Sequence, residues 1–288
     1  MDIFVAALLP MAVVFIMFSL GLGLTPADFA RIAQRPRAFC IGALNQIVML
    51  PLIAFGIILG FGFTGETAVG LMILAACPGG ATSNVITKLA NWDVALSVTL
   101  TAAFSLTCVI TVPLVLTFAV TYFMRTDAPE IDITSTALTA FLLTALPITV
   151  GVALRAFAPK TATAIDPTVS MAATLLFIVV IAGAIASNWQ IVRANFASLG
   201  LGLIAMVAVV SFVSFTLSRW LQATDREAKT ISVETGVQNG ALALAIAGLL
   251  VVDGPIFNAY AVPAALYGVV WLGSALPAFL LLARAGKT

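Results

Sequence analysis

The chain has 288 residues, of which 62% are hydrophobic and only 9% are charged, and its formal net charge is +1. The mean hydropathy is +1.16. A typical globular domain has about a quarter of its residues charged, so this composition excludes a soluble globular protein and predicts a polytopic membrane protein. No basic patch with interleaved aromatic residues indicates nucleic-acid binding.

Nine stretches are long and apolar enough to cross a bilayer core of ~30 Å as helices. Lipid offers no hydrogen-bond partners to the backbone, so we expect an all-α fold. In chain order the stretches cover residues 3–24, 38–61, 66–90, 94–124, 135–157, 168–188, 198–220, 229–251 and 257–283. Turn-forming or charged runs, such as Arg35-Pro36-Arg37 and Asp225-Arg226-Glu227, are expected to separate them. We treat residues 1–288 as a single membrane domain.

The basic residues predict the orientation of the chain. With nine spans, only Arg125 and Arg193 of the 13 Lys and Arg residues fall on one side, and all the others fall on the opposite side. By the positive-inside rule, we expect the N-terminus outside and the C-terminus in the cytoplasm. The expected location is the cell inner (cytoplasmic) membrane, with lipid around the helices.

Polar residues in the second and fourth spans allow two interpretations each. Gln46 lies in mid-span beside Asn45, where an amide commonly hydrogen-bonds to a neighbouring helix. Ser97, Thr101 and Ser105 recur every four residues and line one helix face. Because Ser and Thr often only pack helix against helix in lipid, this spacing does not by itself separate packing from ligand binding.

The third span contains three helix breakers in succession, Pro78, Gly79 and Gly80. We expect the helix to break there, which is tolerated at membrane depth where the exposed backbone lines a cavity. Ser83 and Asn84 would follow at the start of a second half-helix, whose N-terminus favours an anion. A simple proline kink is the alternative, and it leaves the two polar residues unexplained.

Glu234 is the one acidic residue of 12 that lies well inside a span, the eighth. A charge at mid-bilayer costs about 2.5–3.5 kcal/mol on insertion scales, so it needs a partner. Gln238 shares its helix face, Asn239 follows, and no Lys or Arg lies nearby in sequence. A carboxylate grouped with amide oxygens favours a bound cation. The alternative is a protonated glutamate that hydrogen-bonds between helices.

The two interrupted spans, the third and the eighth, occupy corresponding positions in two halves of the chain. Gly236 is the expected break in the eighth. Paired, antiparallel interrupted spans indicate a carrier with inverted repeats, whose site lies where the breaks meet. The chain has no histidine, no Asp-rich metal motif and no Ser/His pairing, so we do not expect an enzyme. Rings of charge and repeated filter loops, which are typical of channels, are absent from the sequence.

At these residues the sequence resembles the bile acid:sodium symporter family. The resemblance runs from FSLGLGLTPADF through CPGGATSN, ALSVTLT and VETGVQN to AVPAALYG. It implies an inverted-repeat transporter with two crossing broken helices, in a nine-helix form that lacks the first helix of the longer pattern. A panel of helices (3–24, 135–157 and 168–188) would flank a core (38–61, 66–90, 94–124, 198–220, 229–251 and 257–283).

The resemblance also implies two sodium sites and no organic cofactor. The first would use Ser83, Asn84, Ser97, Thr101 and Glu234. The second would use Gln46, Glu234 and Gln238, with backbone carbonyls near Thr235 and Val237.

The family's substrates are organic anions such as bile acids, sulfated steroids, pantoate and keto acids. The resemblance places the substrate near Ala81, Thr82 and Asn239. Many bacterial members have a hydroxyl at the position of Ala81 and an amide or a His-Asn pair where this chain has Trp271-Leu272. We predict sodium-coupled symport of an organic anion, with no protein partner. The alternative is a proton-coupled or sodium-independent carrier of the same fold, in which Glu234 is the titrating group.

Overall fold

The computed structural model describes residues 2–124, 133–187, 189–250 and 258–271. Within these ranges the chain is helical and forms no strand beyond one isolated β-bridge. The helices are α1 (Asp2–Leu22), α2 (Pro26–Gln34), α3 (Pro36–Ala43), α4 (Leu50–Phe61), α5 (Gly65–Ala76), α6 (Ala81–Leu89), α7 (Val94–Met124), α8 (Ile133–Ala140), α9 (Leu146–Phe157), α10 (Pro159–Ser187), α11 (Trp189–Trp220), α12 (Asp225–Gly236), α13 (Gly240–Leu249) and α14 (Val262–Val270).

Five helices of the described ranges are long and apolar enough to cross a membrane, and a bent pair of helices at the N-terminus raises the number to six. The third and eighth predicted spans are each divided into two shorter helices, and the last predicted span lies partly outside the described residues. The chain is therefore a multi-pass, all-helical membrane protein, and the number nine remains a prediction. The fourth predicted span is described as one helix, α7, over Val94–Met124.

The two charged separators lie at helix boundaries, and most of their residues form the first turn of the next helix rather than a loop. Pro36 is the first residue of α3, where its missing N–H leaves no intrahelical bond unmade. Asp225 and Glu227 lie in the first turn of α12, and the Glu227 carboxylate accepts hydrogen bonds from the backbone N and the Oγ1 of Thr224, both at 2.9 Å. This capping box starts the helix at a run that composition alone assigns to a loop.

Two apolar spans each contain a short π-helical segment that ends two residues before a proline. The segment η1 (Leu44–Met49) precedes Pro51, and η3 (Phe141–Ala145) precedes Pro147. Proline cannot donate to the carbonyl four residues earlier, and a π turn accommodates the resulting change in hydrogen bonding. In the first case the wider turn carries Asn45 and Gln46, whose side chains are both buried.

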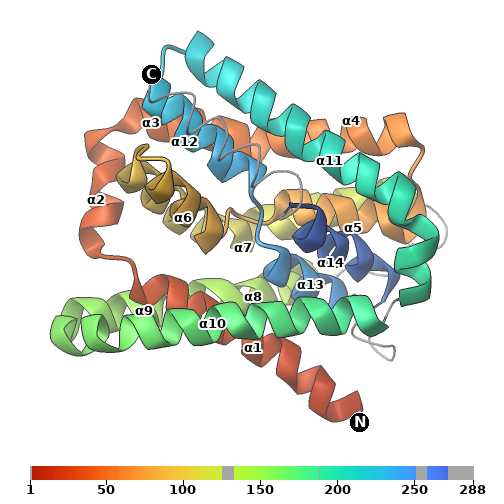
Figure 1. Ribbon diagram of the computed structural model, residues 1–288, viewed down its shortest axis with the longest axis horizontal. Coiled ribbons are helices and arrows are strands. Elements are labelled where there is room, and N and C mark those ends of the chain that lie inside the picture. The colour runs from red at the N-terminus through yellow and green to blue at the C-terminus, as the bar shows by residue number, and fades with distance from the viewer. Residues whose placement is uncertain (1, 125–132, 188, 251–257, 272–288) are drawn as a thin grey trace.

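Three helices pack together along one side of the molecule: α1, α9 and α10 (Figure 1). Gly21 of α1 and Gly151 of α9 bring the two backbones into contact: a Cβ at Gly21 would lie 2.2 Å from the Ile148 carbonyl oxygen. Small residues allow this close approach where van der Waals contact, rather than the hydrophobic effect, holds helices together in lipid.

The two divided helices meet in the interior, between α7, α14 and the group formed by α1, α9 and α10 (Figure 1). The helices α5 and α6 are separated by residues 77–80, and α12 and α13 by residues 237–239. Nearly all residues at these two breaks are buried, as is most of α13. The fold therefore brings irregular backbone together at its centre, where the surrounding helices shield it from lipid.

Candidate functional site

The two helix breaks hold each other through their backbones. Gly79 and Gln238 form an antiparallel β-bridge, and the backbone N of Asn239 donates to the carbonyl oxygen of Pro78 at 2.9 Å. Cys77, Gly80 and Val237 are all extended, so neither helix continues through the crossing. Gly236 is the last residue of α12 rather than part of the break, which consists of residues 237–239.

Gly79 lies directly against the side chain of Glu234. A Cβ at residue 79 would be 2.3 Å from Glu234 Oε1, a distance that real Cβ contacts do not show. At Gly80, by contrast, the nearest atoms to a Cβ would be 4.0 Å away. Glycine at position 79 thus provides the space in which the carboxylate of the opposite helix lies.

The Glu234 carboxylate is fully buried and receives hydrogen bonds from three hydroxyl groups. Ser83 Oγ donates to Oε2 at 2.6 Å, Ser97 Oγ to Oε2 at 3.1 Å, and Thr101 Oγ1 to Oε1 at 2.5 Å. Asn84 joins them: its Oδ1 lies 2.7 Å from Ser97 Oγ and 3.3 Å from Thr101 Oγ1. The structure therefore gathers all five residues of the first predicted sodium site, from α6, α7 and α12. We call this group the carboxylate cluster.

The carboxylate cluster has more acceptor oxygens than protons. Two of these hydroxyls also lie within hydrogen-bond distance of a backbone carbonyl oxygen, Ser83 Oγ of Gly80 O and Thr101 Oγ1 of Ser97 O. Each hydroxyl has one proton to donate, so three protons serve seven acceptor contacts. Among the residues that the structure describes, no Lys or Arg forms an ion pair with Glu234. A buried, proton-poor group of oxygens with one negative charge is suited to a hard cation.

A second buried group, the amide cluster, consists of Gln46, Gln238 and the backbone around them. Gln46 Nε2 donates to the Cys77 carbonyl at 2.9 Å and to Gln238 Oε1 at 3.0 Å. Gln238 Nε2 donates to the Thr235 carbonyl at 2.6 Å. Gln46 Oε1 is buried and has no hydrogen-bond partner in the described part of the chain. A buried acceptor without a partner is costly, and a cation or a water would satisfy it.

The second predicted sodium site is brought together only in part. Gln46, Gln238 and the Thr235 carbonyl meet in the amide cluster, and Val237 follows as a buried, extended residue. The hydrogen bonds of the Glu234 carboxylate that the structure describes all lie in the carboxylate cluster instead. The two clusters are linked through Gly79, which bridges to Gln238 and touches Glu234.

A cavity of about 400 Å³ lies between the crossing and the helices α1 and α10. Its lining includes Thr82 and Asn239, two of the three predicted substrate residues, and also Gly80, Asn84 and Gln238. Ala81, the third, is the first residue of α6; its side chain lies outside the described part. The starts of α6 and α13 therefore both border one cavity, next to the carboxylate cluster.

One residue that supports this site, Tyr267, was not predicted as a site residue. The Tyr267 hydroxyl accepts a hydrogen bond from the backbone N of Gln238 at 2.8 Å and donates to the Gly236 carbonyl at 3.0 Å. A tyrosine within an otherwise apolar span was the available signal, since a buried hydroxyl needs a partner. Trp271 is buried and does not line the cavity, and Leu272 lies outside the described residues.

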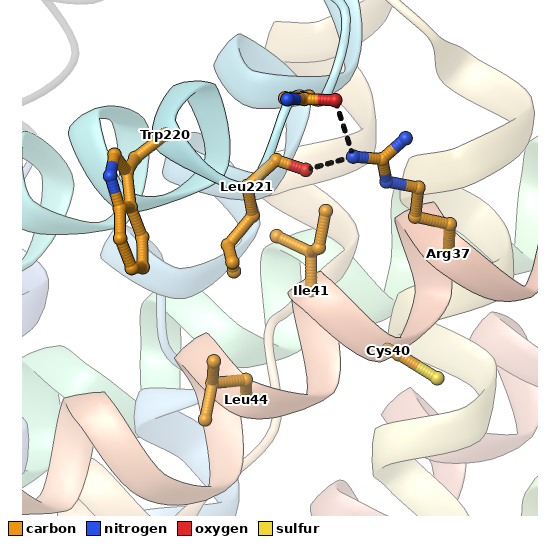
Figure 2. Close-up of a pocket in the computed structure, with 7 residues that line it drawn as sticks. Arg37, Cys40, Ile41, Leu44, Trp220 and Leu221 are labelled. Carbon is orange, nitrogen blue, oxygen red and sulfur yellow. Dashed lines mark hydrogen bonds between the residues drawn. The ribbon is translucent and has the colours of Figure 1, made fainter.

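Another hollow, of about 500 Å³, lies at the surface beside α3 and the end of α11 (Figure 2). There Arg37 Nη2 donates to the Leu221 carbonyl at 2.7 Å and to Gln222 Oε1 at 3.2 Å. Its lining contains no residue of either cluster. We therefore assign the candidate site to the crossing and its cavity.

Comparison with known proteins agrees with the motif-based resemblance. The sequence profile of the Sodium Bile acid symporter family matches residues 10–195. A probable sodium/metabolite cotransporter of the chloroplast from Oryza sativa subsp. japonica is 30% identical over 237 residues, which are 81% of this chain and 54% of that protein. The chain thus spans little more than half of the rice relative's length.

Two other relatives come from distant organisms. An uncharacterized sodium-dependent transporter from Bacillus subtilis (strain 168) is 27% identical over 236 residues, 81% of this chain and 71% of that protein. A sodium-dependent organic anion transporter from Rattus norvegicus is 28% identical over 234 residues, 80% of this chain and 62% of that protein. Each of the three relatives matches about four fifths of this chain.

Proposed function

The chain belongs to the sodium bile acid symporter family, and from that premise we propose that it couples the inward movement of sodium to the uptake of an organic anion. Its relatives are named as sodium-dependent transporters, which supports a sodium-coupled carrier rather than an enzyme. The organic anion is our extension to this chain, because only the rat relative's printed name includes that substrate class.

The carboxylate cluster is the observation on which the proposal rests. Three hydroxyl protons cannot satisfy all the oxygen lone pairs of this cluster. A sodium ion bound there would be coordinated by the remaining lone pairs, on oxygens of Glu234, Ser83, Ser97, Thr101 and Asn84. It would also neutralise a charge that is costly at membrane depth. A protonated Glu234 would add one donor, and it would still leave more acceptor contacts than protons.

The amide cluster supports a second sodium ion. Gln46 Nε2 lies between two acceptor oxygens, those of Cys77 and Gln238, while Gln46 Oε1 has no described partner. Rotation of this amide would turn Oε1 toward the same place, where it would join the other oxygens as a ligand. In this proposal Glu234 completes the site through the space beside Gly79, and the carbonyls near Thr235 and Val237 contribute the remaining oxygens.

The cavity beside the crossing supports a site for the organic anion. The first N–H groups of a helix have no intrahelical partner and carry a partial positive charge. Two such helix starts, those of α6 and α13, border the cavity together. We place the carboxylate of the anion there, near Ala81, Thr82 and Asn239, with its apolar part against Met17, Leu20 and Phe177.

Coupling follows from the position of the sodium ligands. They come from both sides of the crossing, so bound sodium would fix the distance between the starts of α6 and α13, to which the anion binds. In the proposed mechanism, a panel that contains α1, α9 and α10 moves against the remaining helices to alternate access. Sodium drives this only if the two facing states bind it with different affinity.

The orientation proposed from the basic residues implies which side this cavity faces. Its lining includes Gly23 and Leu24 at the end of α1 and Val98 near the start of α7. With the N-terminus outside, both helix ends are cytoplasmic, and the cavity opens toward the cytoplasm. The described state would then be inward-facing.

The test is thermal stabilisation of purified protein by bile acids, pantoate and keto acids, each in sodium and in potassium. We expect at least one anion to stabilise the protein only in sodium, and Glu234→Gln to remove that effect. Glu227→Gln is the matched control, because this carboxylate lies on the same helix but only caps its exposed start. Anion binding that is indifferent to sodium would refute the proposal and favour the proton-coupled alternative.

A further inference from the structure

The cavity beside the crossing has two unlike walls. One wall consists of the starts of α6 and α13, where the side chain of Asn239 caps α13 by accepting a hydrogen bond from the backbone N of Leu242. The other consists of α1 and α10, and it contains polar residues that neither sodium site uses. These are Ser19 of α1 and Asp166, Ser170 and Thr174 of α10. The second wall therefore presents acceptor oxygens and a negative charge toward the first.

Asp166 is the acidic residue of this wall, and it is half-buried. Its Oδ1 accepts a hydrogen bond from Ser170 Oγ at 3.1 Å, and Ser170 Oγ lies 3.4 Å from Ser19 Oγ. The ion pairs within the described ranges use Asp28, Asp93 and Asp225 instead, so no Lys or Arg there neutralises Asp166. The hydrogen bond from Ser170, four residues along the same helix, uses one oxygen of the Asp166 carboxylate. The other oxygen remains available to accept a hydrogen bond from a ligand.

An unneutralised carboxylate is an unfavourable neighbour for a simple organic anion. Two negative charges in one cavity repel each other, and a carboxylate can only accept hydrogen bonds. The same carboxylate is favourable if the far end of the anion carries a hydrogen-bond donor. The cavity is therefore complementary to a molecule that is negative at one end and a donor at the other.

We propose that Asp166, together with Ser170 and Ser19, makes this carrier select organic anions that bear a hydroxyl or ammonium group at the end opposite their carboxylate. This inference rests on the proposed function, because it assumes that the carboxylate of the substrate binds at the starts of α6 and α13. It adds the chemical class of the substrate, which neither sodium site specifies.

The size of the preference follows from the hydrogen bond. A hydrogen bond to a charged group contributes enough to change affinity by about tenfold or more. A site that is built to bind a substrate hydroxyl also discriminates strongly against the analogue that lacks it, because its own polar group is then left unpaired. We expect the ammonium compound to be preferred most, since its charge is opposite to that of Asp166.

The experiment compares three carboxylates of matched length, which end in a hydroxyl, an ammonium or a methyl group, over a graded series of lengths. Their dissociation constants are measured in sodium for the unmodified protein, for Asp166→Asn and for Asp166→Ala. We expect the unmodified protein to bind the donor-bearing compounds about tenfold tighter than the methyl compound. Asp166→Asn should lose the ammonium preference, and Asp166→Ala should lose both preferences while methyl compounds still bind.

Two results overturn the inference, and they are distinguishable. If carboxylates bind in sodium but the ratios are the same in all three proteins, Asp166 does not select the substrate, and the proposed function stands. If no carboxylate of the series binds in sodium, the proposed function fails and this inference fails with it. Glu227→Gln, whose carboxylate does not line the cavity, should leave every ratio unchanged.

Discussion

The first helix break, between α5 and α6, contains no side chain that could bind an ion as a hard ligand. Its residues are Cys77, Pro78, Gly79 and Gly80. The second break, between α12 and α13, is bordered by Glu234 and includes Gln238 and Asn239. The first break supplies space and backbone groups, and the second supplies the charged and amide side chains that enter that space.

Each break is also supported by one polar side chain from a helix outside the pair. Gln46 serves the first break by donating to the Cys77 carbonyl, and Tyr267 serves the second by bonding to Gly236 and Gln238. Backbone groups that have lost their helical partners must be satisfied from elsewhere when they are buried. The comparison indicates that the second break supplies the side chains proposed to bind sodium. The first break and the two supporting side chains, Gln46 and Tyr267, hold those side chains in position.

The largest effect is expected from Gly79→Ala, which fills the space that the first break provides. The new Cβ would lie 2.3 Å from Glu234 Oε1, so either the carboxylate must leave or the two breaks must separate. Overpacking of this kind costs about 1–3 kcal/mol of stability, and we expect stabilisation by sodium to be lost. Gly80→Ala is the matched control, because its Cβ would have no atom closer than 4.0 Å. Equal sodium responses in the two variants would contradict the role given to Gly79.

The next effect is expected from Thr101→Val, which removes one hydroxyl from the carboxylate cluster without changing the size of the side chain much. Thr101 Oγ1 is 2.5 Å from Glu234 Oε1, so sodium affinity should fall by about tenfold. Ser105→Ala tests the same helix face one turn further on, where the hydroxyl is buried without a described partner. Sodium titration of both variants should show a loss for Thr101→Val alone. A similar loss for Ser105→Ala would extend the site along α7.

A smaller and different effect is expected from Gln46→Leu, which removes the support of the first break together with a ligand of the proposed second site. The Glu234 carboxylate keeps its three hydroxyl partners, so one sodium ion should still bind. The Hill coefficient for sodium should fall from about two toward one, as expected when one of two coupled sites is lost. An unchanged Hill coefficient would show that the amide cluster holds no sodium.

The difference between the two breaks also explains which of them the sequence could predict. Pro78, Gly79 and Gly80 are local helix breakers, so the first break follows from residue types alone. The second has no proline, and Gly236, which was expected to form it, is helical. Its position depends on the pairing of Gly79 with Gln238, a contact between residues far apart in sequence. The helix propensities of neighbouring residues cannot predict a contact between two distant segments.

The same distinction applies to the site. Glu234 could be found because a single charge in an apolar span is unusual. The spacing of Ser97 and Thr101 allowed either packing or ligand binding, and the family resemblance then implied the ligand role. For Tyr267 the sequence signalled only that a buried hydroxyl needs a partner, and the identity of that partner, like the surroundings of Asp166, depends on distant parts of the chain. Helix α2 and the π turn at Gln46 were missed for a related reason: short, irregular elements have weak sequence patterns.

The smallest effect on sodium binding is expected from Tyr267→Phe, which removes the support of the second break and no sodium ligand. Its hydroxyl makes two buried hydrogen bonds, to Gln238 N and the Gly236 carbonyl, so their loss should lower stability by about 1–3 kcal/mol. Tyr122→Phe is a matched control: its ring packs against Phe55, its side chain is half-exposed, and no stability change is expected. Thermal unfolding in sodium and in potassium would measure both changes. If the second break only positions ligands, sodium should restore part of the stability that Tyr267→Phe loses, because binding of the ion holds Gln238 and Glu234 in place of the missing hydroxyl. If the loss is the same in both salts, Tyr267 stabilises the fold independently of the ion.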